Sequence, residues 1–309
     1  MSFTVSIVIA TKDSAKTIGM CLNSLMPFFN AETLENIIVV DDGSRDGTEA
    51  IVASYPARLV AGQRSTFFAA YELGWRNASG DLIVFLDSDA FLKIDFLPHI
   101  LSYFEKDSNL GILGVTAEPI AASRVGKLIG QWWDYRYENL VTSLQRKKRI
   151  SWWGRLYLRY TGSGESQVTV QGPCYVIRRE ALVSMDGLPK LGDDLILSRL
   201  LTSKGWKSAW CLHRLVSHFS RSRLSSAALK YVRYGLMWGL ITKPQDSFVT
   251  RLARAGTRAF SPIIAAKIAV KYRSPLHFFL YIMLAGLADW VGHMIALFEN
   301  DEFITVPTG

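Results

Sequence analysis

The sequence predicts an α/β fold with a mostly parallel central sheet flanked by helices. Over residues 1–120, short apolar, β-branched runs alternate with helical patterns, which is typical of parallel strands joined by crossover helices. Acidic residues directly follow two of these runs, and ligands of open α/β sheets bind beyond the carboxyl ends of the strands. The 309-residue chain is 49% hydrophobic, which is enough for a large core without disulfides.

The predicted strands in this part of the chain cover residues 4–10, 36–41, 57–61, 81–87 and 110–116. The helical patterns between them cover residues 14–26, 46–55, 66–78 and 95–105. Each has the length of an ordinary crossover helix. A further strand is expected at 168–178, a helix at 192–203 and short strands near 207–217. From about residue 224 onward the pattern is wholly helical.

Charge differs sharply between the two halves of the chain. Residues 1–120 contain 8 Lys and Arg against 15 Asp and Glu, a net charge of −7. Residues 121–309 contain 27 against 12, a net charge of +15. Basic surface attracts the phosphates of nucleic acids, anionic lipids or phosphorylated acceptors. The sequence contains no nucleic-acid-binding motif, so no nucleic-acid partner is expected.

The three cysteines, Cys21, Cys174 and Cys211, form no Cys-x-x-Cys pair. Their odd number argues against a disulfide framework or a structural zinc site. Near the N-terminus, the apolar run at 6–10 is too short for the core of a signal peptide. These observations favour a cytosolic location.

Residues 124–160 interrupt the alternation of strands and helices. They contain the tryptophan pairs Trp132-Trp133 and Trp152-Trp153 and the basic run at 146–149. Aromatic side chains beside basic ones suit a membrane interface or a sugar-binding surface.

The predicted strand at 36–41 ends in VVDDGS (39–44), which places Asp41 and Asp42 at the carboxyl edge of the sheet. A carboxylate there can accept a hydrogen bond from a nucleobase N–H group or a ribose hydroxyl. Alternatively, the segment forms only a turn and Asp46 only caps the next helix.

The predicted strand at 81–87 is a buried apolar run that stops at Asp87, Ser88 and Asp89. Because side chains alternate faces along a regular strand, carboxylates at i and i+2 lie on one side and can approach a shared cation. Hard oxygen ligands suit Mg²⁺ or Mn²⁺, which keep open positions for diphosphate oxygens. This spacing is also common in turns without function. The position after a buried strand, following an earlier acidic pair, favours the metal site.

A third acidic pair, Asp193-Asp194, follows Gly192 at the start of the predicted helix at 192–203. The helix dipole stabilises carboxylates at this position, so a capping role is one interpretation. The other is a general base, because a hydroxyl that attacks an anomeric carbon must lose its proton and a helix start holds a base rigidly.

Together these segments resemble glycosyltransferase family 2, whose members are inverting enzymes with a GT-A fold. The resemblance covers about residues 3–220. It rests on VSIVIATKDSAKTIGMCLNSL (5–25), VVDDGS (39–44), ASGDLIVFLDSDA (78–90), QGPCYVIRREAL (171–182) and GDDLILSRLLTSKGW (192–206). It implies a GT-A domain at 1–220, with a nucleotide-binding half at 1–120 and an acceptor half at 121–220. A helical, membrane-associated region follows at 221–309.

The resemblance also implies roles for individual residues. Asp87, Asp89 and His218 would hold Mg²⁺ or Mn²⁺, and Asp194 would be the catalytic base. The donor nucleotide would be bound by Thr11, Asp13, Asp41, Asp42, Asp87 and Ser88. The acceptor pocket would contain Gly172, Asp193 and Trp206. For His218 a structural role is the alternative, as for any solitary histidine.

The sequence departs from the family pattern in two ways. Relatives commonly carry Arg-Asn-x-Gly before the metal strand, whereas this chain has Tyr71-Glu72-Leu73-Gly74, which removes a cation and an amide from the donor pocket. The Gln-x-x-Arg-Trp motif of processive polysaccharide synthases is missing from the sequence, which favours transfer of a single sugar.

Residues 275–298 are apolar and long enough to cross a bilayer, which takes roughly 20 residues. Asp289 interrupts them, at an insertion cost of ~2.5–3.5 kcal/mol. A membrane span, an interfacial or re-entrant helix and a buried helix are the three interpretations. The basic residues that precede the segment are Arg251, Arg254, Arg258, Lys267, Lys271 and Arg273. They favour attachment to the cytoplasmic face of a membrane.

The expected function is transfer of a single sugar from a nucleoside-diphosphate donor, by default a UDP-sugar, to a lipid-linked or cell-envelope glycan acceptor. The alternatives are a dolichol- or polyprenyl-phosphate sugar synthase, a nucleotidyltransferase that makes a nucleotide sugar, and a non-catalytic membrane-bound sugar-binding protein. Nucleotidyltransferases usually begin with a glycine-rich phosphate loop, whereas residues 11–15 contain no glycine. The three acidic motifs argue against a protein without catalytic activity.

Overall fold

The structure is a computed structural model of residues 1–309. It describes residues 3–29, 31–62, 67–121, 170, 172–185, 188 and 194–220, together with scattered positions in 123–134, 232 and 284–295. Most of the basic, aromatic segment at 124–160 and most of the predicted helical region after 224 lie outside the described residues.

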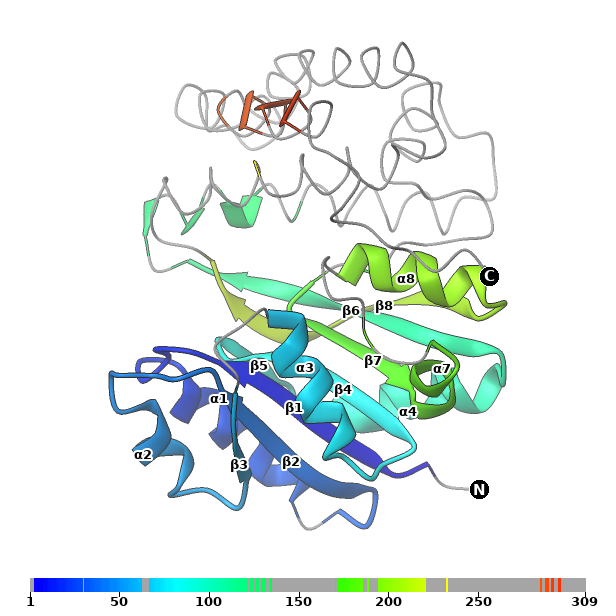
Figure 1. Cartoon of the computed structure of the whole chain (residues 1–309), viewed down its shortest axis with the longest axis horizontal. Coiled ribbons are helices and arrows are strands. Elements are labelled where there is room, and N and C mark those ends of the chain that lie inside the picture. The colour runs from blue at the N-terminus through cyan, green and yellow to red at the C-terminus, as the bar shows by residue number, and fades with distance from the viewer. Residues whose placement is uncertain are drawn as a thin grey trace. The chain divides into compact units, whose positions relative to one another are not determined.

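Within the described part of the chain, eight strands form one sheet in the order β3-β2-β1-β4-β7-β6-β8-β5 (Figure 1). The strands are β1 (Val5–Thr11), β2 (Leu34–Asp41), β3 (Arg58–Ala61), β4 (Leu82–Asp87), β5 (Ala90–Leu92), β6 (Leu110–Ile120), β7 (Cys174–Arg178) and β8 (Lys207–Phe219). Parallel pairing joins β3, β2, β1 and β4. β7 is antiparallel to both β4 and β6, so β6 runs in the same direction as β4. β5 and β8 are antiparallel to each other.

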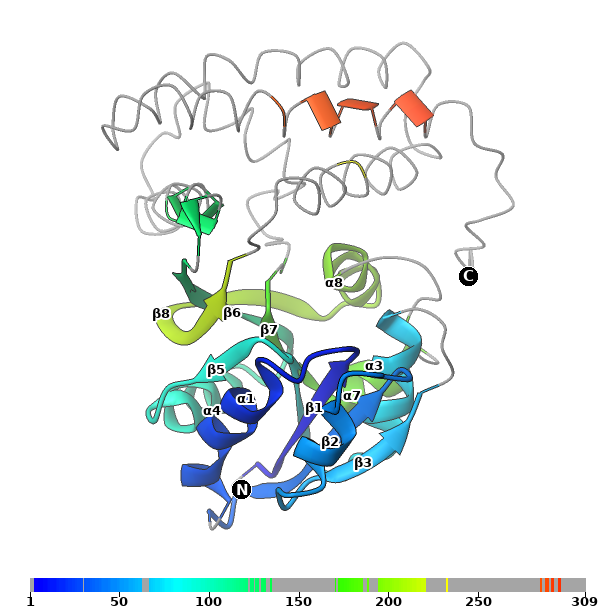
Figure 2. The same ribbon diagram turned by 90° about the vertical axis from the view of Figure 1, so that its left-hand side faces the viewer.

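Helices cover both faces of this sheet (Figure 2). They are α1 (Ile18–Leu25), the short 3₁₀ helix η1 (Met26–Phe28), α2 (Thr48–Val52), α3 (Phe67–Arg76), α4 (Phe96–Lys106), α7 (Arg179–Val183) and α8 (Asp194–Ser203). Buried side chains of α1, α2 and α4 pack in one hydrophobic core, and those of α3, α7 and α8 pack in the other. The layers confirm the predicted α/β class.

The two cores follow from the side-chain alternation of the strands. In β1, Ile7 and Ile9 face the core formed with α1, whereas Val8 faces the core formed with α3. All seven residues of β1 are buried, which is the pattern of a parallel strand covered on both sides.

The structure confirms all five strands predicted in the first 120 residues and corrects several details. The helix predicted at 14–26 begins only at Ile18, and among the described residues of the strand predicted at 168–178 only β7 is a strand. Two elements were missed, β5 and α7, because each is too short to produce a periodic pattern. The expectation of short strands near 207–217 was wrong, since β8 is one strand of 13 residues.

Two compact units divide the chain. The first contains all of the sheet except the last residues of β6 and β8 and comprises residues 1–118 and 140–218, and the second comprises residues 119–139 and 219–309. Among the described residues, none of the helices combines the length and apolar character needed to traverse a bilayer. The apolar segment at 275–298 lies largely outside those residues.

Candidate functional site

The carboxyl ends of β1, β2 and β4 bring polar residues to one edge of the sheet. In the strand register, Thr11 lies opposite Asp41, and Ala10 lies opposite Asp87. The two carboxylate residues therefore flank the end of β1 from its two neighbouring strands. Ligands of open α/β sheets bind beyond this edge.

Asp87, Asp89 and His218 form a cluster beyond the end of β4. His218 Nε2 lies 3.1 Å from Asp89 Oδ1 and 4.0 Å from Asp87 Oδ2. One ligand atom from each residue lies within 4.8 Å of the others, and all three side chains are partly exposed. The pairing of β5 with β8 brings His218 to the cluster, because Ala90, next to Asp89, lies opposite His218 in that pair.

The geometric reason predicted for the carboxylate pair was wrong, although the two carboxylates do lie together. β4 ends at Asp87, and Ser88 and Asp89 form a turn before β5 begins at Ala90. The turn, and not the alternation of side chains along one strand, brings Asp89 to the same side as Asp87. A tight turn also permits the chain to enter β5 immediately after the cluster.

The cluster is suited to a hard divalent cation. The two carboxylate oxygens are ligands that suit Mg²⁺ or Mn²⁺, and the imidazole nitrogen is a common metal ligand in proteins. The negative charges of the two carboxylates repel each other, and a cation bound between them would offset this repulsion. The donor set therefore fits the predicted Mg²⁺ or Mn²⁺.

Two buried thiols lie beneath the cluster and do not belong to its chemistry. The Cys21 thiol is 3.8 Å from the backbone oxygen of Asp87, and Cys174 pairs with Leu86 in the neighbouring strand. Burial, and then the carboxylates of Asp89 and Asp87, raise the pKa of Cys21, while burial followed by Asp87 raises the pKa of Cys174. Both stay protonated, so neither supplies a thiolate nucleophile or ligand.

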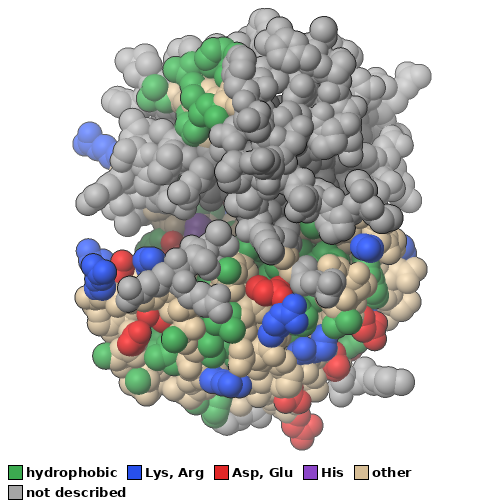
Figure 3. Space-filling view, in the orientation of Figure 1, with side chains coloured by type: hydrophobic (Ala, Val, Ile, Leu, Met, Phe, Trp, Pro, Cys, Tyr) green, Lys and Arg blue, Asp and Glu red, His purple; other side chains and the backbone are tan. Residues whose placement is uncertain are grey.

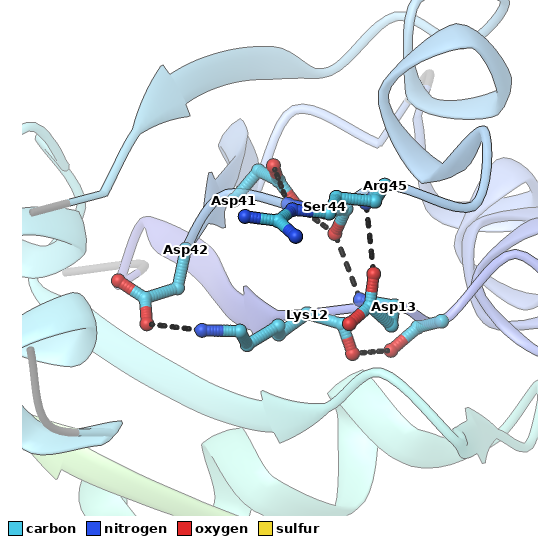
Figure 4. A network of polar contacts seen from close by, with 7 residues as sticks. Lys12, Asp13, Asp41, Asp42, Ser44 and Arg45 are labelled. Atoms are coloured by element: carbon cyan, nitrogen blue, oxygen red, sulfur yellow. Dashed lines mark hydrogen bonds and ion pairs between the residues drawn. The ribbon is translucent and has the colours of Figure 1, made fainter. Parts of the chain in front are cut away.

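The loops after β1 and β2 form a hydrogen-bonded network (Figure 4). Asp41 is only 2% exposed and accepts bonds from the backbone N–H and the hydroxyl of Ser44. Asp13 has a left-handed backbone with φ 49°, its N–H donates to Ser44 Oγ at 2.8 Å, and its carboxylate accepts from the Arg45 N–H at 2.8 Å. The turn interpretation thus describes Asp41, and its role in donor binding stays a prediction.

The carboxylates that reach solvent at this edge belong to other residues. Asp13 is exposed, and Asp42 is partly exposed and lies 3.6 Å from Lys12 Nζ. Asp46 also has a structural part, because its carboxylate accepts bonds from the Thr48 hydroxyl and the Ala15 N–H. The bond from Thr48 has the larger effect, and together the two bonds lower the pKa of Asp46.

Hydroxyl groups of Ser14, Ser88 and Thr11 lie at the same edge of the sheet. Ser14 and Ser88 share a hydrogen bond of 2.9 Å, which ties the turn after β4 to the loop after β1. Thr11 is 4% exposed, and its hydroxyl has no hydrogen-bond partner among the residues that the structure describes. A buried hydroxyl without a partner costs free energy, so this position suits a polar ligand atom.

The remaining predicted residues are placed only in part. Asp194 is the first residue of α8, but its side chain and all of Asp193 lie outside the described residues. Gly172 lies two residues before the start of β7. Trp206 packs against Gly111 and donates to Ser184 Oγ at 3.0 Å. Their catalytic and acceptor roles stay predictions.

One contact of the cluster was not foreseen. Tyr71 on α3 donates a hydrogen bond of 3.2 Å to Asp87 Oδ1. In the sequence this tyrosine occupies an apolar position of a helix, where a core role is the default. The only indication was the unusual segment at 71–74 in place of the family's Arg-Asn-x-Gly.

This sheet, with its acidic cluster beyond a parallel strand, has the architecture of the GT-A fold. The chain belongs to glycosyl transferase family 2, whose pattern matches residues 6–182, more than half of its length. The resemblance found in the sequence is thereby confirmed.

Curated relatives match over part of their length. Glucosyl-3-phosphoglycerate synthase of Mycolicibacterium paratuberculosis is 27% identical over 150 residues, which are 41% of this chain and 45% of that protein. The putative glycosyltransferase EpsH of Bacillus subtilis is 26% identical over 165 residues, which are 50% of this chain and 47% of that protein. The chain thus spans about half the length of these relatives or less.

Solved structures share the fold at low sequence identity. The mannosyltransferase PcManGT of Pyrobaculum calidifontis, in complex with GDP-Man and Mn²⁺, has a TM-score of 0.61 and 15% identity, covering 94% of this chain and 87% of that one. Glucosyl-3-phosphoglycerate synthase of Mycobacterium tuberculosis, in complex with Mn²⁺, UDP and glucosyl-3-phosphoglycerate, has a TM-score of 0.52 and 19% identity, covering 78% and 79%. S. aureus TarS has a TM-score of 0.51 and 14% identity, covering 95% and 90%.

The cluster predicts that Mn²⁺ affinity depends on Asp89 and His218. Asp89→Ala or His218→Ala removes one of the three groups. Each should weaken Mn²⁺ binding by more than the roughly ten- to hundredfold that loss of a supporting partner costs. Titration followed by the electron paramagnetic resonance signal of free Mn²⁺ measures the change.

Matched controls remove a carboxylate or an imidazole that lies outside the cluster. Asp95→Ala removes an exposed carboxylate, and His99→Ala removes a partly exposed imidazole. Both should bind Mn²⁺ like the wild type. Unchanged Mn²⁺ affinity in Asp89→Ala would rule out the cluster as the metal site.

Proposed function

We propose that this chain is an inverting glycosyltransferase that moves one sugar from a nucleoside-diphosphate donor to a hydroxyl group of a lipid-linked or cell-envelope glycan. The observation that supports this most directly is the meeting of Asp87, Asp89 and His218 at the carboxyl edge of the sheet. A diphosphate bound beyond this edge would lie next to the cluster. Family membership supports the transfer of a sugar.

Asp87, Asp89 and His218 would hold Mg²⁺ or Mn²⁺ in this enzyme. The cation would neutralise the negative charge that develops on the departing nucleoside diphosphate. Without a cation the two carboxylates would repel the diphosphate, since all of these groups are anions. The cluster therefore favours donor binding only in the metal-loaded form.

The nucleoside part of the donor would bind at the ends of β1 and β2. The Thr11 hydroxyl, buried and without a partner among the described residues, would gain a hydrogen bond from this ligand. Asp13 and Asp42 would accept from N–H or hydroxyl groups of the nucleoside, because their carboxylates reach solvent. Lys12 beside Asp42 adds a donor.

Transfer with inversion is a single displacement. The acceptor oxygen forms a bond to the anomeric carbon while the bond to the diphosphate breaks, and the acceptor proton passes to a base. Asp194 is the proposed base, because it begins α8 and a helix start holds a carboxylate rigidly.

A thermal-shift panel identifies the donor. Ligands that bind the native state raise the melting temperature. We expect one nucleoside-diphosphate sugar to stabilise the protein in the presence of Mn²⁺ and less so with EDTA. UDP-sugars are the first candidates, and GDP-sugars follow because the mannosyltransferase with a similar fold holds GDP-Man. A panel in which no nucleotide raises the melting temperature would contradict donor binding.

Asp194→Asn tests the catalytic base. Asn cannot take a proton but retains the helix-start preference of Asp, so the fold should persist. We expect transfer to fall by about 10²–10⁴-fold, the usual contribution of a general base, with donor affinity nearly unchanged. Radiolabelled sugar transfer and donor thermal shift measure the two quantities, with Asp95→Asn as the control. Full transfer activity in Asp194→Asn would exclude this residue as the base.

We further propose that the C-terminal unit contacts an anionic membrane surface. Four apolar side chains at helical positions spaced by three or four residues are exposed there, namely Leu284 (45%), Leu287 (57%), Val291 (37%) and Ile295 (41%) (Figure 3). This spacing places them on one face of a helix. The six basic residues between positions 251 and 273 would supply the attraction to acidic head groups.

Vesicle binding tests this surface. Leu287→Gln combined with Val291→Gln should reduce co-sedimentation with phosphatidylglycerol vesicles several-fold, because the exposed apolar area is lost. Ile94→Gln is the matched control, since Ile94 is 70% exposed on the sheet-containing unit. Equal binding by both variants, or no preference of the wild type for phosphatidylglycerol over phosphatidylcholine, would contradict the proposal.

A further inference from the structure

Tyr71 connects the hydrophobic core to the candidate metal cluster. Its side chain is fully buried on α3, and its hydroxyl donates to Asp87 Oδ1 at 3.2 Å.

The ring of Tyr71 is held from several sides. It packs edge-on against Phe85 of β4, with ring centroids 4.8 Å apart, and against Tyr175 of β7, with centroids 6.2 Å apart. Phe85 and Tyr175 stack on each other at 5.1 Å. These contacts leave the hydroxyl little freedom to move relative to the end of β4.

The helix that carries Tyr71 is also fixed against the sheet. Gly74 lies one turn further along α3, and a methyl group there would come within 2.2 Å of Val8 Cγ1. Only glycine permits this close approach of α3 to β1. The distance from the helix to the carboxyl edge is therefore set by direct packing.

The two oxygens of Asp87 face different partners. Oδ1 accepts the bond from Tyr71, whereas Oδ2 is the oxygen nearest to His218, at 4.0 Å. The hydrogen bond orients the carboxylate so that Oδ2 points toward His218. Because a phenol is neutral, it orients Asp87 and leaves the negative charge of the carboxylate in place. A cation at this position would cancel that charge.

We propose that Tyr71 is a positioning residue for the metal site, which fixes Asp87 as a ligand through Oδ2 and thereby raises the affinity for the divalent cation. The inference rests on the proposed metal role of Asp87, Asp89 and His218. It assigns a function to the position where the chain departs from the family pattern. Partners that orient a metal ligand typically contribute ten- to hundredfold in metal affinity.

Tyr71→Phe tests the inference because it removes the hydroxyl and leaves the ring packing in place. The Mn²⁺ dissociation constant should rise by about ten- to hundredfold. Tyr55→Phe is the matched control, since its hydroxyl donates at 3.1 Å to the backbone oxygen of Gly19, a structural bond. This control should keep wild-type Mn²⁺ affinity, and the metal-free melting temperatures of both variants measure any general loss of stability.

The possible outcomes distinguish the positioning role of Tyr71 from the metal site itself. Equal Mn²⁺ affinity in wild type and Tyr71→Phe, together with lost affinity in Asp89→Ala, would overturn the role of Tyr71 and keep the metal site. A wild-type protein that binds no Mn²⁺ would overturn both. An equal loss of affinity in Tyr55→Phe would also overturn the inference, because it would reflect general destabilisation.

Discussion

The parallel register of β1 with β2 and β4 is the constraint on which the candidate site depends. A slip by one residue would turn the side chain of Asp87 to the other face of the sheet. Polar contacts at the opposite ends of the strands oppose such a slip. Ser6 Oγ accepts from the Gly80 N–H at 2.8 Å, and Asp81 accepts from the Thr4 N–H at 2.9 Å. These bonds join the start of β1 to the segment that enters β4, so the alignment at one end determines the site at the other.

The electrostatics of the site explain why a cation belongs there. Asp87 and Asp89 lie close together, and their neighbour in the cluster is a histidine. Lys12 is paired with Asp42 at the end of β2. A doubly charged cation would balance the carboxylates and attract the diphosphate of a donor. The excess of positive charge resides in residues 121–309 instead, where it would serve contact with an anionic surface.

Sequence patterns suffice for much of this fold and for part of its site. Apolar runs that end in aspartate locate β2 and β4, and because parallel strands end at a common edge, Asp41 and Asp87 could be placed together. The cluster itself depends on pairing between residues far apart in sequence. Ala90 and His218 meet across β5 and β8. Local periodicity does not encode that contact, and His218 was expected in the metal site only from the family resemblance. Tyr71 could not be assigned either, since its apolar surroundings resemble those of any core aromatic residue and only its hydroxyl reaches Asp87.

We propose that Asp87, Asp89 and His218 together hold the divalent cation of a glycosyltransferase. Anomalous diffraction from crystals grown with Mn²⁺ and UDP tests it most directly. We expect an anomalous peak within about 2.0–2.3 Å of a carboxylate oxygen of Asp87 or Asp89 and close to His218 Nε2, with diphosphate oxygens completing the coordination. An ordered nucleotide without a peak at this cluster, or a peak bound by other residues, would contradict it.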